Sequence, residues 1–312
     1  MDNKAVSPTL AEALTLYKVE HLAGRNLAPL TRAAYTRDLE ALITWVEQHA
    51  AAGIPTAIDK IERRHLERYL AHMDSLGLAG SYRRRKVAAI RSFFGFLHEQ
   101  GFIPRSPAEK LIPPARARYQ PRVLTEAEYK RLLDAVRHEV RDGAIIEVLL
   151  QTGLRLSELS QLRIGDVELP PTIRRPNAAA KDPGSVGAVH AHGKGRKERT
   201  VTLNWKACKA IKAYLAVRPD DAENDRLFVT KFRRGMGPRA IQRVIEKYVK
   251  EAGIPNASVH ALRHTFATHQ TRRGTKLDVV RQALGHESLA TTSIYVDLAR
   301  DVMDKELQEH AL

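Results

Sequence analysis

The stretch LGHESLATTSIYVDL, residues 284–298, carries a histidine and, nine residues later, a tyrosine. A tyrosine can be a nucleophile, but its phenol is almost entirely protonated at neutral pH. Tyr295 therefore needs a group that takes its proton and an electrophile that cations polarise. A phosphodiester flanked by arginines meets the second need, because the arginines neutralise the charge that builds up in the transition state.

Three earlier segments contain side chains of this kind. TGLRLSEL places Arg155 and Glu158 three residues apart, so both face one way on a helical turn and the carboxylate can hold a guanidinium or an imidazole. HALRHTFATH gives His260 and Arg263 the same spacing. In HGKGRKER, Lys194 lies between two glycines, which allow a tight turn and a close approach of the backbone to a ligand.

Each segment alone also has an ordinary interpretation. TGLRLSEL fits a plain helix with a surface ion pair, GKGRKER fits any basic hairpin, and most of the nine tyrosines should lie in the core or on the surface. His260 and His264 have the spacing of half a metal site, but the segment lacks the glutamate of HExxH and a nearby acidic ligand. We therefore expect no metal and no other cofactor.

The charge balance points to a polyanionic partner. Lys and Arg number 51 against 36 for Asp and Glu, a net charge of +15, and both the first 119 residues and the remainder carry a surplus. Nucleic acid is the most common partner of such a chain; the alternative is a basic but otherwise ordinary enzyme. The single cysteine, Cys208, excludes an intrachain disulfide and a cysteine-based zinc site.

Neither a membrane span nor a signal peptide is visible. No apolar run approaches the roughly 20 residues that a membrane helix needs. The N-terminal stretch MDNKAVSPTLAEAL lacks a basic region followed by an apolar one. We expect a soluble intracellular protein with no membrane partner.

The length of 312 residues suits about two domains. Residues 1–103 have helical apolar spacing, with Thr31 and Ser81 predicted as N-caps of two of the helices. Residues 104–122 hold five prolines among several arginines, which predicts a basic linker. Residues 123–312 are the expected second domain.

A basic run opens the helix predicted from SYRRRKVAAIRSFFGFLHEQG. Four cations at a helix N-terminus oppose the helix dipole, and a DNA phosphate would remove this conflict. The alternative is a solvated charged face. Together with two arginines of the linker, these residues are the predicted DNA contacts: Arg83, Arg84, Arg85, Lys86, Arg116 and Arg118.

The second domain mixes helices with a small β element. Thr125 and Glu128 form a capping box, and AIIEVLLQTG predicts a buried helix that ends at Gly153. LSELSQL predicts a short helix, and VHAHGKGRKERTVTL predicts two strands around a glycine-rich turn. Residues 170–188 are predicted to form a loop.

The order and spacing of these segments resemble the motif boxes of the tyrosine recombinase family, also called phage integrases. TGLRLSEL resembles the first-arginine box, GKGRKERTVTL the lysine hairpin, HALRHTFATH the His-x-x-Arg box and LGHESLATTSIYVDL the tyrosine box. The resemblance covers nearly the whole chain, is strongest over 124–298, and is closest to Xer-type and transposon-borne members. It implies a mainly α fold with a small β-sheet or hairpin, in which a helical SAM-like core-binding domain and an α+β catalytic domain form a clamp around DNA.

The resemblance also implies a reaction. Such enzymes perform conservative site-specific recombination through a 3′-phosphotyrosine and a Holliday junction, without metal or ATP, in DNA integration, excision or dimer resolution. Tyr295 would be the nucleophile, and Arg155 and Arg263 would clamp the phosphate oxygens. Lys194 would protonate the leaving 5′-oxygen, and Glu158 would orient the site.

Two histidines complete the set that the resemblance implies. His260 would accept a proton or donate a hydrogen bond to the phosphate, and His286 would donate to the phosphate. The insertion 170–188 is longer than in typical Xer-like members, and its Arg174 and Arg175 would touch DNA or a neighbouring subunit unless this segment is a plain surface loop.

The implied partners are double-stranded DNA with paired recombination sites, further copies of this chain, and accessory proteins of the host or the mobile element. The chain would be a monomer or weak dimer when free and a homotetramer on synapsed DNA, in the cytoplasm at the nucleoid. The C-terminal stretch ARDVMDKELQEHAL would pack onto the adjacent protomer. Alternatives are a type IB topoisomerase-like relaxing enzyme and a non-catalytic DNA-binding relative.

Overall fold

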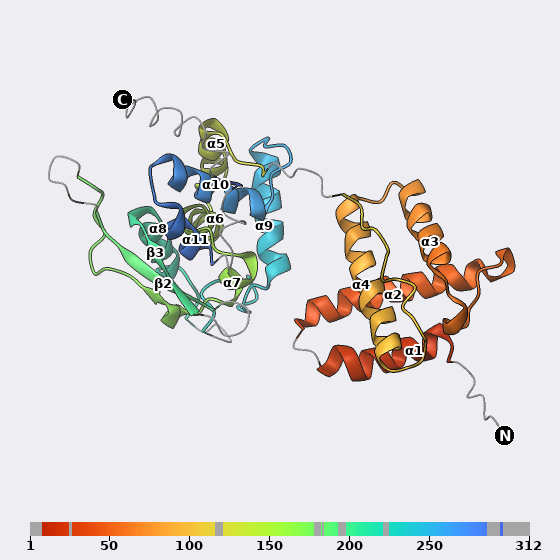
Figure 1. Cartoon of the computed structure of the whole chain (residues 1–312). Helices are drawn as coiled ribbons and strands as arrows, with labels where there is room; N and C mark the ends of the chain where they lie inside the picture. Colours follow the sequence, from red (N-terminus) through yellow and green to blue (C-terminus); the bar gives the residue numbers. More distant parts are fainter. Residues whose placement is uncertain are drawn as a thin grey trace, which may run out of the picture. The chain divides into compact units, whose positions relative to one another are not determined.

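The computed structural model describes residues 8–24, 27–115, 121–177, 182, 184–192, 198–220, 225–285 and 294–295. The chain divides into two compact units, residues 1–119 and 120–312 (Figure 1). This division falls within the stretch 104–122 expected to be the linker. The domain bounds 1–103, 104–122 and 123–312 remain a prediction.

The first unit is helical, and its core lies between the faces of its helices. Leu39 and Leu42 of one helix and Phe93 and Phe94 of another are fully buried there. The helices are α1 (Leu10–Leu16), which continues as a π-helical turn (Tyr17–Leu22), α2 (Pro29–Gln48), α3 (Arg63–Ser75) and α4 (Gly80–Glu99), with 3-10 turns at Ala50–Ala52 and Ile58–Lys60.

Two predicted helix starts are wrong. Helix α2 begins at Pro29 and α4 at Gly80, so each starts before the hydroxyl side chain predicted to cap it, Thr31 or Ser81. Proline is well suited to the first helical position because its fixed φ matches the helix and its missing N–H leaves no donor unpaired. The hydroxyl residues therefore lie inside the first turn.

Residues 104–115 fold back onto the first unit. Ala108 and Leu111 are buried in its core. Arg84 of α4 donates to the carbonyl of Pro114, with Nη2 at 2.8 Å. Arg91 of the same helix donates to the carbonyl of Leu111. This proline-rich segment is therefore held to α4 without forming a helix or strand of its own.

The second unit surrounds α6, which contacts α5, α8, α9, α10 and strand β3 (Figure 1). Its helices are α5 (Glu126–Val136), α6 (Val140–Thr152), α7 (Leu156–Gln161), α8 (Trp205–Leu215), α9 (Pro238–Glu251), α10 (Val259–Arg272) and α11 (Leu277–Leu284), with a 3-10 turn at Ile164–Asp166. The nearly continuous apolar run of α6 explains why it is buried on several sides.

A three-stranded antiparallel sheet completes this unit, in the order β1 (Val167–Glu168), β2 (Gly187–His192), β3 (Glu198–Leu203). Val189 pairs with Val201, and both are buried. The predicted capping box of Thr125, the end of α6 at Gly153 and the two strands of the hairpin are confirmed. The described residues therefore have the predicted class: mainly α with a small sheet in the second unit.

The described part of residues 170–188, which precedes and enters β2, folds against α8. The backbone N–H of Arg174 donates to Ser185 Oγ at 2.7 Å, and the Arg174 guanidinium pairs with Asp182 at 3.3 Å. The guanidinium of Arg175 lies over the indole ring of Trp205, 5.2 Å from its centroid. This part is thus an ordered turn beside the first residue of α8.

Candidate active site

Arg263 of α10 is fixed by the ends of two other helices. Its Nη1 donates to the carbonyl of Gly153, the residue that ends α6, at 2.5 Å. Its Nη2 donates to the carbonyl of Leu284, the last residue of α11, at 2.6 Å. Burial, and next the charge of Arg155, lower the pKa of Arg263 to about 10. The guanidinium therefore remains a cation at neutral pH, held mainly by neutral carbonyls.

Gly153 makes this contact possible. Its φ of +61° lies in the left-handed region, and a Cβ there would lie 2.5 Å from Cδ1 of Phe266. Only glycine avoids both the strain and the collision. The left-handed conformation of Gly153 at the end of α6 thus points its carbonyl toward Arg263.

Arg155 and Arg199 share one buried carboxylate. Arg155 caps α7 and donates to Glu158 through its backbone N–H at 2.7 Å and its Nη1 at 2.9 Å. Arg199 of β3 binds both carboxylate oxygens, at 2.6 and 2.8 Å. Burial alone would raise the pKa of Glu158, but the hydrogen bonds and charge of the arginines lower it to about 2. Glu158 is therefore a permanent anion between two cations.

Arg155 and Arg199 also donate hydrogen bonds to the C-terminal end of α11, which precedes His286 in the sequence. Arg155 Nη2 donates to the carbonyl of Gly285 at 2.7 Å, and Arg199 Nε donates to the carbonyl of Ala283 at 3.0 Å. Arg263 binds the intervening carbonyl of Leu284. Three consecutive carbonyls at the end of α11 are thus each held by an arginine from a different element.

Arg199 was not among the site residues predicted from the sequence. Its signal was the alternation along β3, where Arg199, Val201 and Leu203 share the face that is partly or fully buried. An arginine on the inward face of a strand needs an acidic partner, and the glutamate of TGLRLSEL was available. The basic run GKGRKER did not distinguish this residue from its neighbouring cations.

Tyr295 lies in a small apolar cluster and is only 1% exposed. Its hydroxyl is 3.0 Å from Nδ1 of His264, and the two ring centroids are 5.7 Å apart. The phenol is also close enough to Arg263 to affect the pKa of that guanidinium. The cluster around Tyr295 comprises Phe266, Ala267, Val280 and Leu284.

His264 and His260 occupy different environments on α10. His264 is half-buried; burial first, and then the charges of His260 and Arg263, lower its pKa to about 4. His260 is exposed, whereas Arg263, three residues later, is buried. Lys194 and His286, the other two predicted site residues of this unit, lie outside the described residues.

The predicted DNA contacts of α4 have partners within the first unit. Arg83 pairs with Asp74 at 2.6 Å, and Arg85 pairs with Asp38 at 2.9 Å. Lys86 is buried and lies 3.4 Å from Asp38. Acidic residues within the unit therefore supply counter-charge to this helix start, so the conflict with the helix dipole does not by itself require a phosphate. The DNA-contact role of Arg83–Lys86 stays a prediction, and Arg116 and Arg118 lie outside the described residues.

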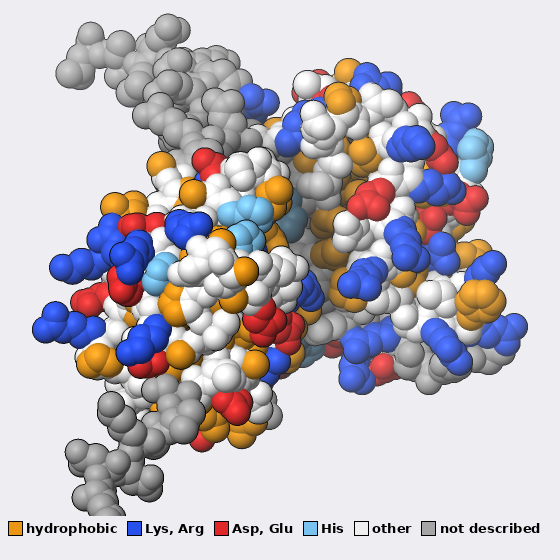
Figure 2. Space-filling model, turned by 90° about the vertical axis from the view of Figure 1, so that its right-hand side faces the viewer, with side chains coloured by type: hydrophobic (Ala, Val, Ile, Leu, Met, Phe, Trp, Pro, Cys, Tyr) orange, Lys and Arg blue, Asp and Glu red, His pale blue; other side chains and the backbone are white. Residues whose placement is uncertain are grey.

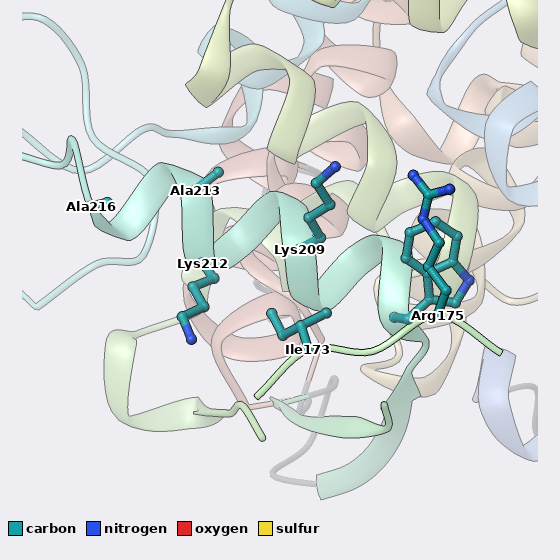
Figure 3. A pocket seen from close by; sticks show the side chains of 7 residues that line it. Ile173, Arg175, Lys209, Lys212, Ala213 and Ala216 are labelled. Atoms are coloured by element: carbon teal, nitrogen blue, oxygen red, sulfur yellow. The ribbon is translucent and has the colours of Figure 1, made fainter. Parts of the chain in front are cut away.

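A hollow on the described surface is lined by none of the site arginines Arg155, Arg199 and Arg263. It has a volume of about 540 Å³ and lies along α8, where Figure 3 shows Arg175, Lys209 and Lys212 around it. Of the residues singled out from the sequence, Arg175 lines it, whereas the predicted catalytic residues within the described part of the chain do not. The described residues contain no cluster of three metal-ligand side chains and no helix long and apolar enough to cross a membrane.

Comparisons with known proteins agree with this fold. Residues 122–301 match the phage integrase family, and residues 16–101 match the phage integrase N-terminal SAM-like domain. The chain is 34% identical over 297 residues to the tyrosine recombinase XerC of Pelobacter propionicus, covering 94% of this chain and 92% of that protein.

Two solved structures have the same fold. One is the XerH site-specific recombinase bound to palindromic difH substrate, with a TM-score of 0.72, 21% identity, and coverage of 90% of this chain and 80% of that one. The other is a lambda integrase tetramer bound to a Holliday junction, with a TM-score of 0.69, 17% identity, and coverage of 92% and 80%. The fold and the sequence similarity are those of tyrosine site-specific recombinases. The chain belongs to the phage integrase family and is similar throughout to Xer tyrosine recombinases.

Proposed function

We propose that the protein is a tyrosine-type site-specific DNA recombinase, which breaks and rejoins DNA without metal or ATP. One observation carries the proposal. Arg155 and Arg263 bind two consecutive carbonyls, those of Gly285 and Leu284, in the segment that leads to Tyr295. This brings two permanent cations and the phenol into one part of the second unit.

In the proposed reaction, the Tyr295 oxygen attacks the scissile phosphorus and forms a 3′-phosphotyrosine. Arg155 and Arg263 neutralise the charge on the non-bridging oxygens, and Glu158 holds Arg155 in place. The P–O5′ bond breaks, and Lys194 gives the leaving oxygen its proton. The 5′-hydroxyl of a partner strand then attacks the phosphotyrosine, so the bond energy is retained and no nucleotide is consumed.

His260 and His286 would assist the phosphate in this scheme. The exposed position of His260 at the first turn of α10 supports contact with a bound DNA backbone. His286 directly follows the carbonyls that the arginines hold, so it would enter the site from the same segment. Both would donate to the phosphate, and His260 could also receive a proton.

The partner would be double-stranded DNA carrying paired sites. Lys and Arg side chains are spread over the face drawn in Figure 2, and the net charge is +15. A related recombinase has been solved on its difH site and another as a tetramer on a Holliday junction. We infer a clamp of the two units around DNA, a homotetramer on two synapsed sites, a monomer or weak dimer when free, accessory proteins, and action at the nucleoid in the cytoplasm.

A plasmid assay tests recombination against the relaxing alternative. Two copies of a site recovered by covalent capture with the wild-type chain are placed as direct repeats on one supercoiled plasmid. Recombination gives two smaller circles. Relaxation of both the two-site plasmid and a one-site control, without smaller circles, would instead support a type IB topoisomerase-like activity.

A further inference from the structure

The proposed reaction gives the phenol proton no definite acceptor: His260 could receive a proton, but the phenol of Tyr295 is in contact with His264. Its Nδ1 lies 3.0 Å from the Tyr295 hydroxyl, within hydrogen-bond range. We propose that His264 is a catalytic residue that takes this proton as Tyr295 attacks phosphorus. The inference rests on the proposed function, which makes Tyr295 the nucleophile.

Three other described groups of the site are poor acceptors. Arg155 and Arg263 are cations that can only donate. Glu158 already accepts from Arg155 and Arg199 with both oxygens, and its pKa of about 2 makes it a weak base. A group that removes a proton must be within hydrogen-bond reach of it, and His264 meets this condition.

The imidazole ring of His264 can take up the phenol proton and later return it. Neutral His264 with its proton on Nε2 accepts at Nδ1 from the phenol O–H. As the Tyr295 oxygen bonds to phosphorus, the O–H bond breaks and the proton moves to Nδ1, which gives an imidazolium. The P–O5′ bond breaks on the opposite side, where a separate acid protonates the leaving oxygen. On rejoining, Nδ1–H returns the proton to the departing tyrosine oxygen.

The charges around His264 make its pKa depend on whether a DNA phosphate is bound. Burial and the charges of His260 and Arg263 keep the pKa of His264 at about 4, so its ring is neutral and able to accept at physiological pH. Other charged groups near Arg263 are Arg155, Arg199 and Glu158. A DNA phosphate between the arginines would add negative charge and raise the pKa of His264 toward the range of an effective base.

The test compares His264→Asn with His269→Asn. An asparagine oxygen can accept the phenol hydrogen bond but is not a base. His269 lies on the same helix and contacts the ring of Tyr129 instead, which makes it the matched control. The measurement is the rate of covalent complex formation on a captured DNA site that carries a nick, so that cleavage is irreversible, together with DNA binding and thermal unfolding of each variant.

At pH 7.5, His264→Asn should form the complex on the order of 100-fold more slowly or worse, as for loss of a general base. DNA binding and unfolding temperature should stay at the wild-type level, and His269→Asn should react at the wild-type rate. The deficit should shrink as pH rises toward the phenol pKa, because phenolate then forms without a base. A rate for His264→Asn equal to or above that of the wild type would overturn the proposal.

A second substrate separates the two ends of the reaction. With sulfur at the 5′-bridging position the leaving thiolate needs no acid, so Lys194→Ala should recover while His264→Asn stays slow. Recovery of His264→Asn on this substrate would place its role at the leaving group and refute the proposal. Tyr295→Phe decides the underlying function separately: a covalent complex from that variant would contradict the nucleophile itself, whatever His264 does.

Discussion

Glu158 and Arg199 form a bidentate ion pair, with oxygen–nitrogen distances of 2.6 and 2.8 Å, that joins the buried Glu158 side chain of α7 to strand β3. Through Arg199 Nε the pair also holds the carbonyl of Ala283. The guanidinium of Arg199 therefore connects three parts of the second unit: strand β3, helix α7, which Arg155 caps, and the segment that leads to Tyr295.

We predict that Arg199→Lys slows covalent complex formation more than it weakens DNA binding. A lysine keeps the charge but cannot bind both carboxylate oxygens and the Ala283 carbonyl at once. The expected loss is about 10- to 100-fold in rate, typical of a residue that orients the groups bound to the reaction centre. Arg226→Lys, outside this network, should react at the wild-type rate. Equal losses in rate and in DNA affinity for Arg199→Lys would contradict a positioning role.

The sequence predicted most elements of the second unit because their signals are local. The Thr125 capping box, the αL end of α6 at Gly153 and the alternation of β3 each depend on neighbouring residues. The link between Glu158 and Arg199 spans 41 positions in the chain, and the contact between His264 and Tyr295 spans 31. No periodicity indicates which side chains meet over such separations.

In the first unit, a local signal was misleading. From the sequence, the cationic start of α4 is predicted to bind a DNA phosphate. In the structure, Asp38 of α2 and Asp74 of α3 form ion pairs with three of its cations. The helix dipole argument was sound for an isolated helix. It failed because acidic partners on other helices cannot be recognised from the sequence of α4.

Lys86→Met is therefore expected to destabilise the protein. Lys86 and Asp38 are both almost fully buried, and the variant would leave the carboxylate with less of its compensating charge. Breaking such a pair costs about 3–5 kcal/mol, and the remaining contact from Arg85 should place this loss near the lower end. Chemical denaturation measures it. The double variant Lys86→Met with Asp38→Asn should recover much of the stability; additive losses would show that the two residues are not coupled.

Gly153→Ala should be more damaging than other glycine substitutions in the same unit. The new Cβ would need a left-handed φ and would meet the Phe266 ring. Overpacking and strain together cost about 2–4 kcal/mol. Gly165 has open space around its Cβ position, so Gly165→Ala is the control and should unfold at nearly the wild-type denaturant concentration. Similar midpoints for both variants would mean that α6 ends without this constraint.

Acid stability provides a test of Glu158. Its folded pKa of about 2 lies below the value of an unpaired glutamate near 4.5, so the charged form is favoured by folding. This contribution is present above pH 4.5 and is lost as pH falls toward 2; a difference of this size corresponds to about 3 kcal/mol. Glu158→Gln should unfold more easily at pH 7 but lose less further stability between pH 4.5 and 2. An exposed control, Glu246→Gln, should follow the wild-type pH curve.

Covalent capture of DNA by the wild-type chain, followed by sequencing of the DNA-linked peptide, tests the central claim most directly. The account predicts one modified peptide, with the 3′-phosphate on Tyr295, and no covalent product from Tyr295→Phe despite normal DNA binding. A linkage at any other residue, or a covalent complex that survives Tyr295→Phe on a denaturing gel, would contradict it.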